Sequence, residues 1–218
     1  MAAKRTGPPI NWLEAFKPLF KKYHGRKHPL THENTYQLVV KVVLSARDSD
    51  KHINAITSAL FAKYPSVKEL ATAKPEDLYS LIGDVTNFAS KAAWLVEMAK
   101  TVRNDKQIPM TMGGLTVLKG IGRKSANVIM SESGAEMEGV IVDLHVLRVA
   151  PRLGIAQGTN PVKIEKQLME AVPQKFWQQL GMSLTFLGRE ICRPTNPHCL
   201  ECPMNPVCEY YNALKKKK

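Results

Sequence analysis

Four cysteines in one short, proline-rich segment are the feature that most restricts how this chain can fold. Cys192, Cys199, Cys202 and Cys208 follow the pattern C-x6-C-x2-C-x5-C within CRPTNPHCLECPMNPVC. The first residues lack the apolar core of a signal peptide, so we expect a cytoplasmic protein whose thiols stay reduced. Thiolates this close together argue against four unconnected cysteines. They predict a tetrahedral sulfur site that ties the C-terminal segment down, with structural zinc and an iron–sulfur cluster as open alternatives.

The rest of the chain has the apolar periodicity of helices and lacks the pattern of strands joined by hairpin turns. The valine-rich segment ENTYQLVVKVVLSA would suit a strand on propensity alone, but its length favours a buried helix with Thr31 as N-cap. Pro75 and Pro161 are expected at first helical positions, the latter after an Asn160 cap. We therefore predict an all-α fold, whose longer helices lie within residues 11–23, 33–46, 50–64, 74–84, 88–105, 161–172 and 175–192.

The chain is strongly basic. Lysine and arginine number 31 against 19 aspartate and glutamate residues, which gives a formal net charge of +12 and a pI of about 9.6. This charge favours attraction to nucleic acid, although a merely basic soluble protein is an equal alternative on composition alone. No apolar run approaches the length of a membrane span, so we expect no membrane partner.

The segment LKGIGRKSANVIM predicts a hairpin between two helices, with Gly120-Ile121-Gly122 as its turn. Glycine permits positive φ and the close approach of another backbone, and Ile121 can tuck inward between the helices. The first N–H groups of the second helix then point outward at the positive end of its dipole. With Arg123 beside them, they can hold a DNA phosphate without reading a base. An ordinary helix–helix turn is the alternative.

Two further residues could carry chemistry. Lys124 lies in the first turn of the predicted second helix, and a neutral lysine amine is a nucleophile that can form a Schiff base. A second phosphate clamp is the alternative for this residue. Asp143 ends the apolar run GVIVD before another helical segment, which makes it a natural N-cap as well as a rigidly held carboxylate. His145 is expected to be hydrogen-bonded within the fold rather than to shuttle protons.

Taken in order, LKGIGRKSANV, VDLHVLRV and the cysteine pattern resemble the endonuclease III branch of the helix–hairpin–helix DNA glycosylases. The resemblance runs from VVLSARDSD to the last cysteine. It implies a two-domain all-helical fold with a DNA cleft between the domains. The iron–sulfur cluster domain would comprise residues 1–27 and 136–218, and the helical barrel domain with the helix–hairpin–helix motif would comprise residues 28–135.

The same resemblance implies the roles of particular residues. Lys124 would attack the sugar C1′, Asp143 would support that step, and the four cysteines would hold a [4Fe–4S] cluster. Gly120, Gly122 and Arg123 would bind the DNA backbone. Arg47 stands where the family usually has a glutamine that fills the gap left by the flipped base. The residues expected near the base pocket are Ser45, Asp50 and His145.

The sequence therefore predicts a bifunctional DNA glycosylase and apurinic/apyrimidinic lyase that removes oxidised pyrimidines from double-stranded DNA. We expect a nucleoid-associated monomer. One alternative is a monofunctional glycosylase for mismatched or alkylated bases, and Lys124 argues against it because a hydrolytic enzyme needs no amine there. The other is a non-catalytic, metal-stabilised DNA-binding protein, against which the coincidence of Lys124 and Asp143 argues.

Overall fold

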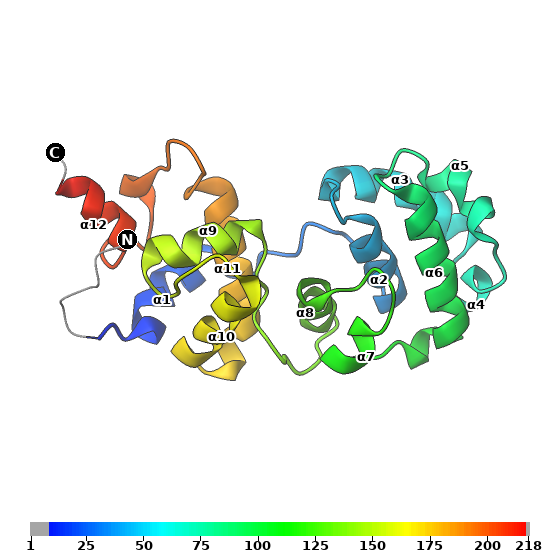
Figure 1. Cartoon of the computed structure of the whole chain (residues 1–218), viewed down its shortest axis with the longest axis horizontal. Helices are drawn as coiled ribbons and strands as arrows, with labels where there is room; N and C mark the ends of the chain where they lie inside the picture. Colours follow the sequence, from blue (N-terminus) through cyan, green and yellow to red (C-terminus); the bar gives the residue numbers. More distant parts are fainter. Residues whose placement is uncertain (1–8, 217–218) are drawn as a thin grey trace. The chain divides into compact units, whose positions relative to one another are not determined.

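The computed structural model describes residues 9–216, and all regular structure in that range is helical, which confirms the predicted all-α fold (Figure 1). None of the helices in the described part is long and apolar enough to cross a membrane. The described part of the chain divides into two compact units: Lys27–Glu138 forms one, and residues 9–26 together with residues 139–216 form the other. The sequence predicts these two boundaries between residues 27 and 28 and between residues 135 and 136.

The unit Lys27–Glu138 is built around α2, the predicted valine-rich helix. Nearly every residue of α2 from Tyr36 to Leu44 is buried, and α3, α6 and α8 pack against it. A helix that is apolar on all sides removes its side chains from water only when other elements cover all of its sides. The elements of this unit are α2 (Thr35–Leu44), α3 (Asp50–Lys63), α4 (Val67–Leu70), η1 (Pro75–Leu78), α5 (Tyr79–Ile82), α6 (Phe88–Val102), η2 (Asp105–Gln107), α7 (Met112–Thr116) and α8 (Arg123–Glu132).

The predicted N-cap of α2 was wrong. Asn34, not Thr31, caps the helix, since its Oδ1 accepts the Gln37 N–H at 2.9 Å. Thr31 lies in the preceding loop, where its carbonyl accepts a hydrogen bond from Lys41 Nζ at 2.6 Å. Both residue types cap helices well, so the sequence alone could not choose between them.

The second unit packs α1, α9, α10 and α11 around one apolar core. The stripe expected on the first helix is buried as Phe16, Leu19 and Phe20, and Phe20 stacks on Phe176 with ring centroids 5.9 Å apart. Asn160 caps α10 and Pro161 is its first residue, as predicted. The elements are α1 (Trp12–Lys22), α9 (Leu144–Leu153), α10 (Pro161–Ala171), η3 (Gln174–Phe176), α11 (Trp177–Glu190), η4 (Cys199–Glu201) and α12 (Glu209–Lys215).

Helices α9 and α11 lie against each other with a glycine at the crossing. A Cβ on Gly188 would lie 2.6 Å from the Cβ of His145 and 3.1 Å from a methyl group of Val149. The neighbouring atoms are short, stiff parts of side chains, so they cannot swing away. This glycine therefore sets how closely the two helices approach, and with it the packing of the helix that follows Asp143.

We predict that Gly188→Ala lowers the free energy of unfolding by about 1–3 kcal/mol, because the added methyl overfills the crossing. The matched control is Gly113→Ala in α7, where an added Cβ meets no atom within 4 Å. Alanine is the better helix former, so this control should be neutral or stabilising by up to about 1 kcal/mol. Urea unfolding followed by circular dichroism measures both, and equal effects would show that the α9–α11 crossing is not tight.

Candidate functional site

The glycine hairpin forms as predicted, with its turn between α7 and α8. Gly120 has φ +84°, and a Cβ there would lie 2.8 Å from Cε3 of Trp94 and 3.3 Å from a methyl of Val43. Ile121 is buried, and its N–H donates to the carbonyl of Leu118 at 3.1 Å. The turn is therefore pressed against α6 and α2, and only glycine fits both the backbone angle and the space at position 120.

The first turn of α8 faces solvent. Gly122 is the N-cap and has no side chain to accept from the helix N–H groups, and both Arg123 and Lys124 are exposed. The geometry suits an anion from solvent at this helix end. The Arg123 guanidinium also reaches back to the carbonyl of Glu138, 3.5 Å away, which the sequence gave no reason to expect. Lys124 follows directly, two residues before Ala126, the first buried residue of α8.

Asp143 is the N-cap of α9, as predicted. Its Oδ1 accepts both the His145 N–H, at 2.9 Å, and the Val146 N–H, at 2.8 Å. Both cap bonds use the same oxygen, so Oδ2 lies outside the cap. A half-buried carboxylate held in one orientation by two backbone donors is well placed to present its second oxygen to a ligand. Asp143 belongs to the unit that begins at Gly139, and Lys124 belongs to the other unit.

His145 is held within its own unit. The guanidinium of Arg148 can only donate, and it donates to His145 Nδ1 at 3.2 Å. Burial lowers the pKa of His145, and the nearby Arg189 and Arg148 lower it further, while Asp143 opposes them. A neutral imidazole bonded in this way agrees with the expectation of a structural hydrogen-bonded histidine.

The loop after α2 carries the other residues expected near a base pocket. Ser45 is the C-cap of α2, and its hydroxyl donates to the carbonyl of Val42 at 3.0 Å. Arg47 is exposed and has φ +63°, an uncommon backbone angle for a residue with a side chain. Asp50 is the first residue of α3. These residues thus lie close together in the sequence, from the C-cap of α2 to the first residue of α3.

Two features of this loop were missed from the sequence. Asp48 Oδ1 lies 2.8 Å from His52 Nδ1, one helical turn further on. Burial raises the pKa of Asp48, but the hydrogen bonds to this carboxylate, led by the one from His52, outweigh burial, so the pKa is lowered. Lys91 is buried, and its amine bonds to carbonyls at the end of α2. Lys91 precedes the buried Leu95 and Met98 by four and seven residues, which places it on the apolar face of α6. This spacing is the sequence pattern from which the burial of Lys91 could have been predicted.

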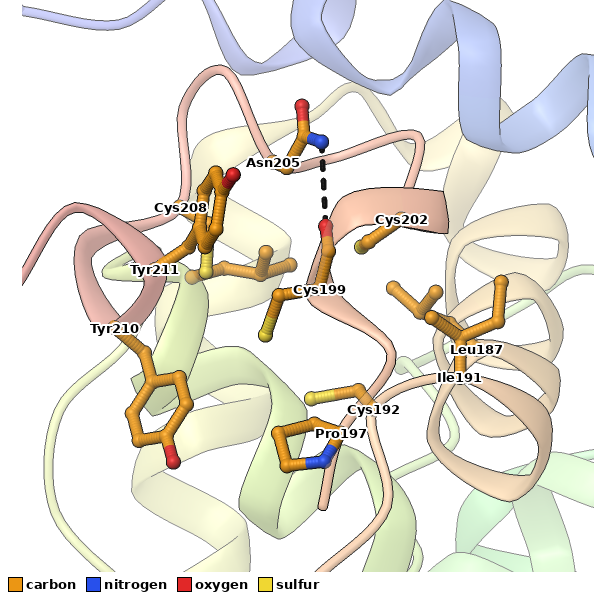
Figure 2. A pocket seen from close by; sticks show the side chains of 11 residues that line it. Leu187, Ile191, Cys192, Pro197, Cys199, Cys202, Asn205, Cys208, Tyr210 and Tyr211 are labelled. Carbon is orange, nitrogen blue, oxygen red and sulfur yellow. Dashed lines mark hydrogen bonds between the residues drawn. The ribbon is translucent and has the colours of Figure 1, made fainter. Parts of the chain in front are cut away.

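The four cysteines line one pocket, together with apolar residues that include Leu187, Ile191 and Pro197 (Figure 2). Cys192 follows α11, Cys199 opens η4, Cys202 follows it, and Cys208 precedes α12. The carbonyl of Cys199 accepts from Asn205 Nδ2 at 3.2 Å, which braces the loop. Within residues 9–216, no three His, Cys, Asp or Glu side chains meet the geometry of a single metal ion.

Burial favours the protonated form of three thiols in this pocket, those of Cys199, Cys202 and Cys208. Burial raises the pKa of Cys202 to about 11 and also raises the pKa values of Cys199 and Cys208. Arg152 brings positive charge close, with Nη1 3.5 Å from Cys192 Sγ. A donor set made only of cysteine sulfur suits zinc or an iron–sulfur cluster, whose charge converts thiols to thiolates.

Comparisons with known proteins agree on one family. Residues 40–174 match the model of the HhH-GPD superfamily base excision DNA repair proteins. Endonuclease III of Synechocystis sp. is 33% identical over 192 residues, which cover 87% of this chain and 88% of that protein.

Two solved structures of endonuclease III with DNA are also similar, each with a TM-score of 0.84 and 27% identity. One is a non-covalent complex, and the match covers 96% of this chain and 100% of the chain in that structure. The other is a trapped covalent intermediate with an estranged adenine, matched over 100% of its length and 97% of this chain.

The cap geometry of Asp143 predicts a difference between two substitutions. Asp143→Ala removes the oxygen that two N–H groups share, so the free energy of unfolding should fall by about 1 kcal/mol. Asp143→Asn keeps an amide oxygen in the same place, and asparagine caps about as well as aspartate, so stability should change little. Urea unfolding measures both variants. Equal losses would mean that the charge of Asp143, and not its cap bonds, stabilises α9.

Proposed function

Because this chain belongs to the endonuclease III branch of the HhH-GPD superfamily of base excision DNA repair proteins, we propose that it is a bifunctional DNA glycosylase and apurinic/apyrimidinic lyase. Its substrate class is double-stranded DNA that contains oxidised pyrimidines. The observation that carries the proposal is Lys124, an exposed amine in the first turn of a helix that begins at a glycine hairpin. The trapped covalent complex of a relative with DNA supports a covalent route.

Lys124 is the nucleophile in the proposed reaction. With the damaged base flipped out of the duplex, the neutral amine forms a bond to C1′ as the bond from C1′ to the base breaks. Ring opening gives a protonated Schiff base, which makes the C2′ proton acidic. Loss of that proton forms a C1′–C2′–C3′ conjugated system and expels the 3′-phosphate, so the strand breaks on the 3′ side of the lesion.

Asp143 stabilises the positive charge that develops on the sugar as the base departs. Its Oδ1 is occupied by the N–H groups of His145 and Val146, so Oδ2 is the oxygen that we assign to this role. A carboxylate fixed by its own backbone needs no reorganisation during the reaction, which is the condition for effective electrostatic stabilisation. The negative charge of the Asp143 carboxylate is more important than its shape, because the transition state is a sugar cation.

The remaining predicted site residues bind rather than react. Gly120 and Gly122 let the hairpin backbone meet a phosphate, and Arg123 adds positive charge beside it. Arg47 contacts the strand opposite the lesion, and Ser45, Asp50 and His145 contribute to recognition of the damaged base. These contacts suit a monomer that acts on chromosomal DNA in the cytoplasm, with the net charge of +12 supplying sequence-independent affinity.

The two units correspond, in this proposal, to the family's cluster domain and its barrel domain with the helix–hairpin–helix motif. Cys192, Cys199, Cys202 and Cys208 would hold a [4Fe–4S] cluster, which supplies a covalent brace for the C-terminal segment. The donor set supports this assignment, because four cysteine thiols, one of them buried and three partly buried, line the pocket without a His, Asp or Glu side chain among the described residues.

The proposed reaction is tested by borohydride reduction during turnover of a duplex with one oxidised pyrimidine. We predict a covalent protein–DNA adduct with the wild-type protein and none with Lys124→Gln, together with loss of base release by at least about 10²-fold. Lys119→Gln is the matched control, because Lys119 is an exposed lysine of the same hairpin that pairs with Glu97 at 2.9 Å. An adduct that survives Lys124→Gln, or is lost equally in Lys119→Gln, would remove Lys124 from the reaction.

The proposed cluster is tested by chemical analysis of protein prepared with ample iron. We expect about four iron and four sulfide ions per chain, and their loss in Cys202→Ser together with a large loss of soluble protein. Met204→Leu is the control: Met204 is fully buried in the same segment, and a swap of similar volume should cost less than about 1.5 kcal/mol and keep the iron. A result of one zinc ion per chain and no sulfide would show that the cysteines hold zinc and not an iron–sulfur cluster.

A further inference from the structure

A buried lysine on α6 holds the end of α2. Only 2% of the surface of Lys91 is exposed, and its Nζ donates to the carbonyls of Leu44 and Ala46, both at 2.7 Å. Burying an ammonium group is unfavourable unless it is fully engaged in hydrogen bonds. An uncharged residue would pack this helix face more easily, so the polar contacts are what a lysine contributes here.

The contacts complete the hydrogen bonding at the carboxyl end of α2. The last carbonyls of a helix have no intrahelical partner. Ser45 serves two of them, since its N–H donates to Lys41 and its hydroxyl to Val42, and Lys91 serves Leu44. The negative end of the helix dipole also favours a cation at this place.

The second contact of Lys91 reaches beyond the helix. The carbonyl of Ala46 and the N–H of Arg47 share one planar peptide group, so fixing the carbonyl fixes the entry of the chain into Arg47. On the other side of that residue, Thr86 Oγ1 lies 3.5 Å from the carbonyl of Arg47. The Asp48 N–H also returns to the carbonyl of Ser45 at 3.0 Å.

Arg47 needs such support. Its φ of +63° costs of order 1 kcal/mol or more for a residue with a side chain, and such angles persist only where the surroundings fix them. The side chain itself is exposed to solvent. Its direction therefore depends on the backbone, and the backbone depends on the contacts from Lys91 and Thr86.

We propose that Lys91 is a positioning residue, which acts through the Ala46–Arg47 peptide to aim the Arg47 guanidinium at the strand opposite the lesion. This rests on the proposed function. Arg47 carries several donors and can pair with the two acceptors on one edge of an orphaned guanine. Lys91 would thereby set the preference for the opposite base without touching DNA.

The test compares kcat/KM for one lesion opposite guanine and opposite adenine. A good bidentate contact is worth about 1–3 kcal/mol, so the wild-type ratio should be about 5- to 150-fold in favour of guanine. Lys91→Met keeps an unbranched side chain that ends where the lysine Cε lies but removes the donors, and the ratio should fall towards one. Strand cleavage of a single-stranded abasic oligonucleotide, which has no opposite base, should stay within about twofold of wild type.

A double-mutant cycle separates positioning from a general structural role. In the Arg47→Ala background, Lys91→Met should change the guanine-to-adenine ratio no further, because the residue it positions is gone. An additive effect in that background, or an unchanged ratio in Lys91→Met alone, would overturn the proposal. If Lys91→Met gives no folded protein, Lys91→Gln takes its place, since one short amide cannot bond both carbonyls, and the same outcomes decide.

A second measurement does not depend on catalysis. Amide hydrogen exchange at Ser45 and Asp48 should quicken at least about tenfold in Lys91→Met, whereas the Tyr64 amide, which closes the end of α3 on the Leu60 carbonyl at 2.8 Å, should not change. Unchanged exchange at Ser45 and Asp48 would show that Lys91 does not hold the loop. A wild-type protein without glycosylase or lyase activity would refute the proposed function alone, and exchange would still decide the role of Lys91.

Discussion

The close contact of Gly120 with the ring of Trp94 determines where the functional helix α8 begins. The missing side chain lets the turn meet α6 and α2 at once, and the left-handed backbone angle then directs the chain into α8. Ile121 adds a buried anchor, and the pair Lys119–Glu97 ties the turn to α6 from the outside. Lys124 therefore sits on a helix end that is fixed before any substrate arrives, which reduces the entropy lost on reaching a reactive geometry.

The ends of helices carry most of the residues to which we assign a function. The amino end of α8 offers N–H groups and Lys124, and the amino end of α9 fixes Asp143 through two bonds to one oxygen. At the carboxyl end of α2, Lys91 donates to two carbonyls and so supports the backbone at Arg47. The common reason is that helix ends leave backbone groups without intrahelical partners, so they can bind ligands or hold side chains in fixed directions.

Periodicity and capping chemistry predicted much of this structure from the sequence, including the buried α2, the glycine hairpin and the caps at Asp143 and Asn160. These features depend on neighbours within a few residues. The contacts that sequence reasoning missed join distant segments: Lys91 bonds carbonyls more than forty positions away, and Arg123 reaches Glu138. The prediction of Thr31 as the N-cap of α2 was wrong for another reason: Asn34 caps equally well, and the carbonyl of Thr31 is instead bonded to Lys41 in the preceding loop.

The proposed chemistry of this protein depends on one atom, Nζ of Lys124. The most direct measurement is peptide mass spectrometry of the borohydride-reduced adduct after nuclease digestion, which locates the residue that bears the sugar remnant. The account predicts the remnant on Lys124, in a peptide that begins within the hairpin. A remnant on Lys119, Lys91 or any other amine would contradict it, because Lys124 would then bind DNA without acting as the nucleophile.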